Sequence, residues 1–407
     1  MIELQDPSAD IRYKIAHNSG VGDPLNKIWF HKTASAVIEA GRCVRCGSCV
    51  AACPSNSISV AEDGLPTLTR MCTGCSACWD FCPLAGLRAE RLWKLFENSH
   101  AKTDGLGVVQ ASFSARAKVP ATRAQDGGVV TTLLEELLTA NEIDGVLVTK
   151  RRDTQRGQTI VARTVQEIRE SAGSIYDQTL PLALNDLREI EEGTRLAMVG
   201  TPCQITSLRA LQRYGWHDRK EATNAVKLTI GLFCNRSFNG LQLTLQLAKA
   251  GVDPRRMEKV NVSEGVLSVY DADRRILLER PVREFHGAAL RGCDECADFS
   301  GRLADIAVGS VGSPDGWSTV LVRTEAGRKA WDIAQNGLIK EDSANVEEVA
   351  RLERRNRTMA ARNLKRPYDE DAALWISYED HLRAYMGTDR EPEPVPAYRS
   401  HHYTTAC

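Results

Sequence analysis

Two stretches decide the fold near the start of this chain: Cys43-Val-Arg-Cys46-Gly-Ser-Cys49-Val-Ala-Ala-Cys53-Pro54 and Cys72-Thr-Gly-Cys75-Ser-Ala-Cys78-Trp-Asp-Phe-Cys82-Pro83. Both follow the spacing C-x2-C-x2-C-x3-C-P, which holds 4Fe–4S clusters. A cubane cluster needs four thiolates in roughly tetrahedral directions, and three cysteines spaced two residues apart can reach three of its corners. The cysteine before the proline points away and reaches the other cluster. The pattern therefore predicts a domain that moves single electrons.

The spacing also predicts which cysteines share a cluster. Small residues such as Gly47 and Gly74 let the backbone approach the sulfides. The last cysteine of each run serves the other cluster, which gives two ligand sets: Cys43, Cys46, Cys49 and Cys82, and Cys72, Cys75, Cys78 and Cys53. A zinc site or a disulfide framework is the alternative, but zinc sites pair C-x2-C units across a longer gap.

Composition bounds the class of protein. The chain has 407 residues, 43% hydrophobic residues and a net charge of −1, which gives no argument for nucleic-acid binding. No apolar run is long enough to span a membrane, and the start does not resemble a signal peptide. Thirteen cysteines, mostly in cluster spacing, indicate a reducing compartment. We therefore expect a cytoplasmic protein, with attachment to the inner membrane face only through a partner.

The sequence pattern changes along the chain and divides it into four expected regions. We expect an N-terminal arm with a short helix near Ala34–Ala40, and a second helix from Arg88 to Phe96. The expected divisions are an arm (1–40), a bacterial-ferredoxin-like 2×(4Fe–4S) domain (41–100), an α/β domain (108–340), and a C-terminal helix with an extended tail (341–407). The charged helix Ala344–Lys365 is expected to expose its basic half to solvent.

The α/β prediction follows from strands that alternate with helices. Strands at 145–149, 196–199 and 226–233 are accompanied by helical patterns at 129–138, 205–213 and 241–250. Residues 260–276 are typical of antiparallel hairpins. Short strands at 305–308 and 319–322 flank a glycine-rich loop, and a helix follows at 325–335. The fold class is therefore α/β, or α+β, with a small iron–sulfur domain in front.

Four further cysteines lie in the α/β region: Cys203, Cys234, Cys293 and Cys296. Isolated cysteines are commonly buried as core residues, so spacing alone leaves that interpretation open. Cys203 and Cys234 follow predicted strands directly, at the edge where α/β folds build sites. The remaining pair forms a C-x2-C motif, and together the four favour a third cluster.

Two glycine-rich segments could present backbone N–H groups to an anion. One is the loop Gly309–Ser318, and the other is Gln125-Asp126-Gly127-Gly128, which precedes a predicted helix. A surface turn would look similar to either. No G-x-G-x-x-G fingerprint follows a strand, so a Rossmann NAD site is not indicated.

These residues resemble the beta subunit of coenzyme F420-reducing hydrogenase and its dehydrogenase relatives, over roughly residues 108–340. The resemblance rests on Ala124–Gly128, Pro202-Cys203-Gln204, Cys234, His286-Gly287 with Cys293 and Cys296, and Ala304–Gly327. It implies a bound FAD, a 4Fe–4S cluster held by the second cysteine set, and F420 docked against the flavin. Ile175 stands where the hydrogenase subunit has a lysine.

The resemblance implies a mechanism: hydride passes between F420 and FAD, and single electrons pass through 4Fe–4S clusters to or from a partner. The partner would be an oxidoreductase subunit of a hydrogenase, formate dehydrogenase or quinone-reducing complex, or a ferredoxin. His286 and Trp317 are the candidate catalytic residues. The candidates for binding FAD or F420 are Gln125, Asp126, Gly127, Gly128, Thr201, Gly312, Ser313, Asp315 and Gly316.

Two alternatives remain open. A related flavin and iron–sulfur reductase could reduce an organic ring, as chlorophyllide-reductase-like enzymes do, with electrons from ferredoxin. A subunit that only relays electrons, without flavin, is the other.

Overall fold

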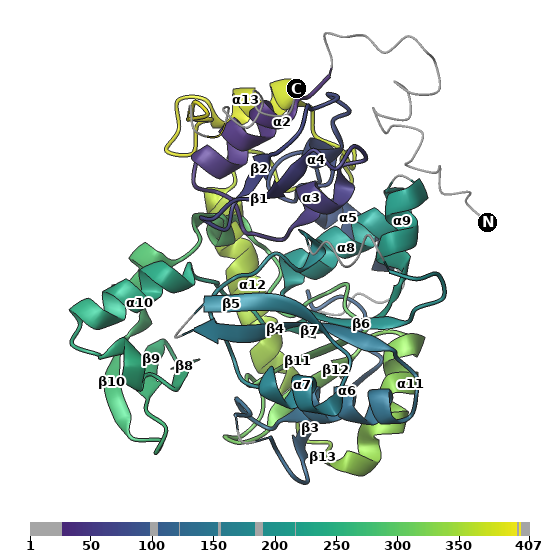
Figure 1. The fold of residues 1–407 in the computed structure, drawn as a ribbon, viewed down its shortest axis with the longest axis vertical. Helices are drawn as coiled ribbons and strands as arrows, with labels where there is room; N and C mark the ends of the chain where they lie inside the picture. Colours follow the sequence, from purple (N-terminus) through teal and green to yellow (C-terminus); the bar gives the residue numbers. More distant parts are fainter. Residues whose placement is uncertain are drawn as a thin grey trace.

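The computed structural model describes residues 27–97, 105–121, 123–153, 156–183, 190–215, 217–396 and 399. The N-terminal domain lies above a large mixed sheet that carries helices on both faces, and a small antiparallel sheet projects to one side (Figure 1). Among these residues no helix is both long enough and apolar enough to cross a bilayer.

The N-terminal domain is built from short elements between the cysteine loops. They are α2 (Phe30–Thr33), the π-helical turn η3 (Ala34–Glu39), α3 (Ser48–Ala52), β1 (Ile58–Val60), β2 (Pro66–Leu68), α4 (Ala77–Asp80) and α5 (Ala89–Glu97). The expected helix near Ala34 is confirmed, although its helical region begins at Phe30. Phe30 and Ile38 pack in one cluster with Val50 and Ile58, so this part of the predicted arm contributes to the core of the cysteine region.

The central sheet has eight strands in the order β13-β3-β12-β11-β7-β6-β4-β5. Strands β4, β6, β7 and β11 are parallel, and antiparallel strands flank them on both sides. The bounds are β3 (Ala111–Ala117), β4 (Gly145–Asp153), β5 (Arg156–Ala162), β6 (Leu196–Gly200), β7 (Val226–Leu232), β11 (Ile306–Gly309), β12 (Ser318–Val322) and β13 (Leu338–Glu341). The five strands expected from the sequence are confirmed, and β3, β5 and β13 are additions.

Helices cover both faces of this sheet. On one face lie α6 (Val129–Thr139), α7 (Val165–Glu170) and α11 (Glu325–Ala334); on the other lie α8 (Pro202–Tyr214), α9 (His217–Asn224) and α12 (Val346–Asn363). Each face has its own hydrophobic core cluster. Leu133 and Trp331 belong to the cluster under α6, α7 and α11, and Leu208 and Val349 belong to the cluster under α8 and α12. Successive residues of β12 alternate between the clusters, as the two-residue period of a strand requires.

The expected hairpins form the three-stranded antiparallel sheet β10-β9-β8, which α10 (Gly240–Lys249) covers. Its strands are β8 (Lys259–Ser263), β9 (Val266–Tyr270) and β10 (Ile276–Pro281). Short 3-10 helices connect the elements: η4 (Pro181–Ala183), η6 (Pro254–Arg256), η7 (Val282–Ala288), η8 (Arg291–Glu295) and η9 (Gln335–Gly337).

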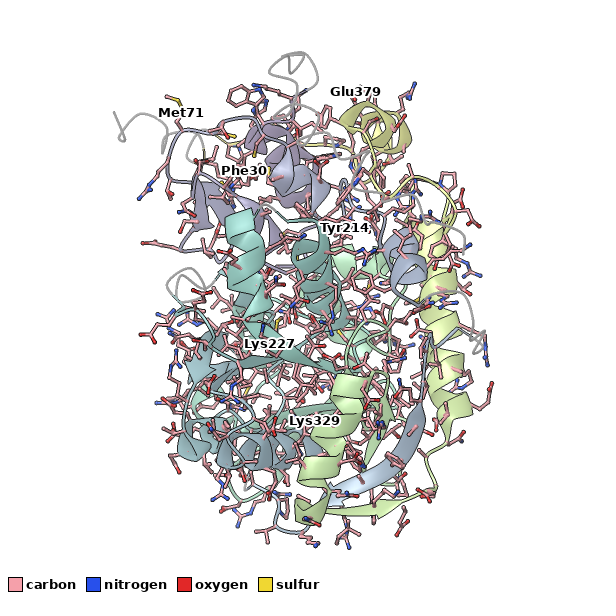
Figure 2. The ribbon with its side chains drawn as sticks, turned by 90° about the vertical axis from the view of Figure 1, so that its right-hand side faces the viewer. Phe30, Met71, Tyr214, Lys227, Lys329 and Glu379 are labelled. Atoms are coloured by element: carbon pink, nitrogen blue, oxygen red, sulfur yellow. The ribbon has the colours of Figure 1, made fainter. Side chains whose placement is uncertain are left out.

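The C-terminal segment, residues 364–396, returns to the N-terminal domain. Figure 2 places Glu379, in α13 (Tyr378–Tyr385), beside the domain that contains Phe30. The backbone N–H of Ile376 donates to the Gly86 carbonyl at 2.8 Å, and that of Glu393 donates to the Ser35 carbonyl at 3.0 Å. The extended tail is therefore anchored rather than a free linker. The basic face expected on α12 is exposed, as its arginines Arg351, Arg354, Arg355 and Arg362 show, whereas Glu353 of the same helix is fully buried.

Candidate redox centre

The first predicted ligand set comes together in the N-terminal domain. Burial raises the pKa of the Cys49 thiol, and the neighbouring thiols of Cys46, Cys43 and Cys82 add to this rise. The pKa of Cys43 is raised to about 11 in the same way. Several buried or half-buried thiols that repel one another need a shared cation, and the irons of a cluster supply one.

The second set assembles around Cys78. Burial is the largest cause of the raised pKa of its thiol, and the negative charges of Cys75, Cys72 and Cys53 raise this pKa further. Cys53 therefore joins the second run, as the crosswise assignment requires. The charges of Cys49 and Cys78 also interact, so the two ligand sets are neighbours.

Hydrogen bonds surround the sulfur atoms of both sets. Backbone N–H groups donate to the thiols of Cys43 (from Arg45, 3.4 Å), Cys72 (from Gly74, 3.4 Å) and Cys53 (from Ser57, 3.2 Å). Such bonds stabilise a thiolate and help to set the potential of a bound cluster.

The third set is brought together by elements far apart in sequence. Cys203 lies in the first turn of α8, Cys234 follows β7, Cys293 lies within η8, and Cys296 follows η8 directly. Burial raises the pKa of Cys234 to about 12, with Cys293 the largest neighbouring charge. Burial also raises the pKa of Cys203, whose charged neighbours are Cys296, Cys46 and Cys234. The four thiols fit the donor set of a cubane.

These sets differ from the ligands of a single metal ion. Within the described ranges, no group of three or more His, Cys, Asp or Glu side chains converges on one ion position. A cubane spreads its four thiolates around a cage of iron and sulfide, whereas zinc ligands gather about one atom.

An apolar cavity lies between the third set and the N-terminal domain. Its lining includes Val44, Leu84 and Trp93 from the N-terminal domain, and Cys203 and Cys296 from the third set. Cys46 and Cys203 are close enough for their charges to interact. The third set is thus adjacent to the first.

Gln178 is a residue that the sequence did not reveal. Its amide donates to Thr201 Oγ1 at 2.8 Å and approaches Cys203 Sγ at 3.7 Å, while its carbonyl accepts from Ser237 Oγ at 2.9 Å. Ser237 Oγ in turn lies 3.8 Å from Cys234 Sγ. Gln178 therefore orients two cysteines of the third set, and no spacing in the sequence signals this role. Thr201, a predicted cofactor-binding residue, has its Oγ1 atom 3.3 Å from the Cys203 sulfur.

The segment 125–128 lies at the start of α6, as predicted. Gly128 has φ +72° and no side chain caps the helix, so the first N–H groups of α6 are open to an anion. A Cβ on Gly127 would lie 2.6 Å from the Ala115 carbonyl oxygen and 2.9 Å from the Ser318 nitrogen. Glycine is thus required where this turn meets β3 and β12. The missing side chain at Gly127 therefore serves the close packing of this turn against both strands.

Polar groups surround this turn. Gln125 donates to Asn261 at 2.7 Å, and Lys259 donates to the Gln125 carbonyl at 2.9 Å. Burial raises the pKa of Asp126, against the opposing charge of Lys259, and Asp315 adds to the rise. Asp126 and Asp315 therefore belong to one neighbourhood.

Tyr176 connects this neighbourhood to the third cysteine set. Its hydroxyl accepts a hydrogen bond from the backbone N–H of Val262 at 3.0 Å. Its hydroxyl group interacts electrostatically with both Asp126 and Cys234, while burial is the main cause of its raised pKa.

Other predicted residues serve the fold or lie apart. Ser313 Oγ lies 2.7 Å from both Ser114 Oγ and Thr319 Oγ1, and a Cβ on Gly312 would lie 2.7 Å from the Asn345 carbonyl. These two residues join the loop to β3 and α12. Gly316 occupies an open turn with φ +77°.

The two candidate catalytic residues have separate surroundings. His286 is exposed on η7, and its charged neighbours are Arg236 and Asp294, beside the third cysteine set. Trp317 precedes β12 and lies under the Arg116 guanidinium, 4.9 Å from its ring centroid. Neither role follows from these contacts.

Comparison with known families matches this arrangement. Models described as "Coenzyme F420 hydrogenase/dehydrogenase, beta subunit" match at residues 112–184 for the N-terminal part and 193–347 for the C-terminal part. A 4Fe–4S dicluster domain matches at residues 35–87. The chain belongs to the coenzyme F420 hydrogenase/dehydrogenase beta subunit family.

Relatives within the F420 hydrogenase/dehydrogenase family support the assignment. The coenzyme F420 hydrogenase subunit beta of Methanothermobacter thermautotrophicus is 35% identical over 50% of this chain and 73% of its own length. The structure is also similar to part of a solved F420-reducing [NiFe] hydrogenase complex from Methanosarcina barkeri. One of its chains aligns with a TM-score of 0.60 and 27% identity, covering 64% of this chain and 93% of that one.

A third similar protein is longer than this chain. The coenzyme F420-dependent sulfite reductase of Methanocaldococcus jannaschii is 31% identical over 329 residues, or 78% of this chain. The present chain spans 49% of that relative.

Proposed function

We propose that this chain is an iron–sulfur flavoprotein subunit that transfers hydride between coenzyme F420 and FAD. It passes single electrons through 4Fe–4S clusters to or from a partner oxidoreductase. FAD would supply the conversion between two-electron and one-electron chemistry. The family and its iron–sulfur domain support the coarser role, electron transfer linked to F420.

The observation that carries this proposal is the serial order of the sites. Tyr176 is close enough to interact electrostatically with both Asp126, beside α6, and Cys234 of the third cysteine set. Cys203 of that set neighbours Cys46, and Cys49 neighbours Cys78. The order supports one path from the flavin candidate residues through three cluster sites.

The chain's own residues would bind and orient the two ring systems. The open N-terminus of α6 would hold the FAD pyrophosphate, and Gly127 allows the helix to approach β3 closely enough. Half-buried Tyr176 would shield the ring from water on the side facing Cys234. Thr201 and Gln178 would orient the Cys203 thiol.

A group of cations near this turn suits an anionic substrate such as F420. Lys259 donates to the Gln125 carbonyl, and Arg123 pairs with Glu258 at 2.8 Å. Arg151 is close enough to Arg123 and Glu258 to interact with them electrostatically. Because Ile175 replaces the lysine of the hydrogenase subunit, we propose that these cations meet the negative charges of F420.

The test is reduction of the flavin by its proposed partner. Anaerobically purified protein, with iron and FAD restored, should lose its oxidised-flavin absorbance when mixed with reduced F420. Reduction by NADH or ferredoxin but not by reduced F420 would contradict the proposal. Ferredoxin-driven reduction of an added tetrapyrrole would indicate the ring-reductase alternative, and a protein that binds no flavin would indicate a simple relay.

A further inference from the structure

A buried group of charges joins three parts of the chain. Arg42 donates to Glu295 twice, from Nε to Oε1 at 2.9 Å and from Nη2 to Oε2 at 2.7 Å. Arg390 Nη1 donates to Glu295 Oε1 at 2.6 Å, and the Tyr385 hydroxyl donates to Oε2 at 2.8 Å. The Arg42 and Glu295 side chains are fully buried, and Arg390 is 3% exposed. We call these four residues the Glu295 hub.

The hub joins the ligand loops of two cluster sites. Arg42 directly precedes Cys43 of the first set, and Glu295 directly precedes Cys296 of the third. The Arg42 guanidinium also interacts electrostatically with the Cys82 thiol. Each end of the ion pair is therefore fixed to a cluster-binding loop.

The two loops also touch through their backbones. A Cβ on Gly292, beside Cys293, would lie 1.9 Å from the Arg42 carbonyl oxygen and 2.8 Å from Val44 Cγ1. No side chain fits at this position, so glycine sets the closest approach of the third loop to the first.

We propose that the Arg42–Glu295 pair and the Gly292 contact are positioning elements that fix the separation and the relative potentials of the first and third clusters. The inference rests on the proposed third cluster. It assigns these residues a role in electron transfer that neither cysteine spacing nor helix packing requires.

The charges give this role a definite sign. Reducing a cluster adds negative charge, so a buried cation favours the reduced form and a carboxylate opposes it. Two guanidiniums face one carboxylate in the hub. His381, 3.1 Å from Arg42, stays neutral because burial lowers its pKa to about 3. Stability alone is a weak reason for such a group, since buried ion pairs are often no better than apolar packing.

The first experiment compares Arg42→Gln with Glu295→Gln in the fully reconstituted protein, by EPR-monitored redox titration. Arg42→Gln should lower the midpoint potential of the Cys43 cluster, and Glu295→Gln should raise it. We expect each change to alter the ratio of reduced to oxidised cluster by roughly tenfold at a fixed applied potential. The double variant should fall between them. A purely structural role would not produce shifts of opposite sign.

Glu90→Gln is the matched control. Glu90 is a buried carboxylate that also pairs with two arginines, Arg366 and Arg88, at the contact between the same C-terminal segment and the N-terminal domain. It should leave the potential of the Cys43 cluster unchanged, whereas the third cluster is expected to respond, because Glu90 lines the same cavity as Cys203 and Cys296. Equal shifts of the Cys43 cluster in Glu90→Gln and Glu295→Gln, or shifts of the same sign in both single hub variants, would overturn the inference.

The second experiment tests separation without changing charge. Gly292→Ala should weaken the magnetic coupling between the two reduced clusters in EPR spectra, because the added methyl group pushes the loops apart. Full iron content with unchanged coupling would contradict the positioning role. Iron near eight atoms in the unmodified chain would instead refute the third cluster, and with it the proposed function.

Discussion

Trp79 Nε1 donates a hydrogen bond of 2.8 Å to the backbone carbonyl of Ile376, across 297 residues of sequence. Trp79 follows Cys78, a predicted cluster ligand, and is fully buried. Its ring also meets Tyr378 and His381 edge-on. The C-terminal segment thus forms part of the wall around the iron–sulfur domain.

Trp79→Phe should destabilise this domain. The substitution leaves the Ile376 carbonyl without its indole donor and opens space, at a cost of roughly 1–3 kcal/mol. Chemical denaturation of the reconstituted protein, followed by loss of cluster absorbance, measures the effect. The control is Trp375→Phe: Trp375 lies on the same segment, and its buried indole nitrogen has no partner within the described ranges. Equal losses in both variants would deny the importance of the hydrogen bond.

The third cysteine set predicts the iron content. Three cubanes give about twelve irons per chain, and Cys293→Ser should remove about a third of them. Cys407→Ser provides the control, because this cysteine lies outside the described residues and outside every predicted ligand set. Iron analysis that shows no difference between the two variants would rule out Cys293 as a ligand.

Gly127→Ala should reduce flavin binding. Its methyl group would collide with β3 and β12, so the N-terminus of α6 must shift away from the position proposed for the pyrophosphate. Flavin released on denaturation gives the occupancy. Gly251→Ala serves as a comparison, since no atom would lie within 4 Å of its Cβ and only the left-handed backbone is strained, by about 1 kcal/mol. Full flavin occupancy in Gly127→Ala would contradict the proposed site.

Glu353 predicts a pH dependence of stability. Burial, and then the charge of Asp298, raise its pKa to about 7. Between pH 4.5 and 7 the folded state therefore holds a proton that the unfolded state releases, so stability should fall as pH rises through this window. The loss should be about 1–3 kcal/mol.

Glu353→Gln should flatten this dependence, because a glutamine side chain does not titrate. The fold should be retained, since the amide oxygen can still accept from the backbone N–H groups of Phe299 and Ser300. Denaturation midpoints at pH 5 and pH 7 measure the difference. Glu347→Gln, a largely exposed change on the same helix, should keep the wild-type slope. An unchanged slope in Glu353→Gln would assign the pH dependence to other groups.

Much of the architecture was predictable from local patterns. The alternation of strands and helices gave β4, β6, β7, α8 and α10, because hydrophobic periodicity reports which side of an element is buried. Strands β3 and β13 were missed. Their residues are mixed in polarity, and they become strands only by pairing with β12 and with each other.

The candidate site divides in the same way. The cysteine spacing by itself determined that this is a 4Fe–4S dicluster domain and predicts two crosswise ligand sets, since a cubane constrains neighbours only a few residues apart. The tertiary structure decided that Cys203, Cys234, Cys293 and Cys296 meet, and that Gln178 and Tyr176 lie beside them. It also decided that Arg42 meets Glu295, 253 residues away. Such contacts depend on how the sheet, α12 and the C-terminal segment pack, and no local spacing records that packing.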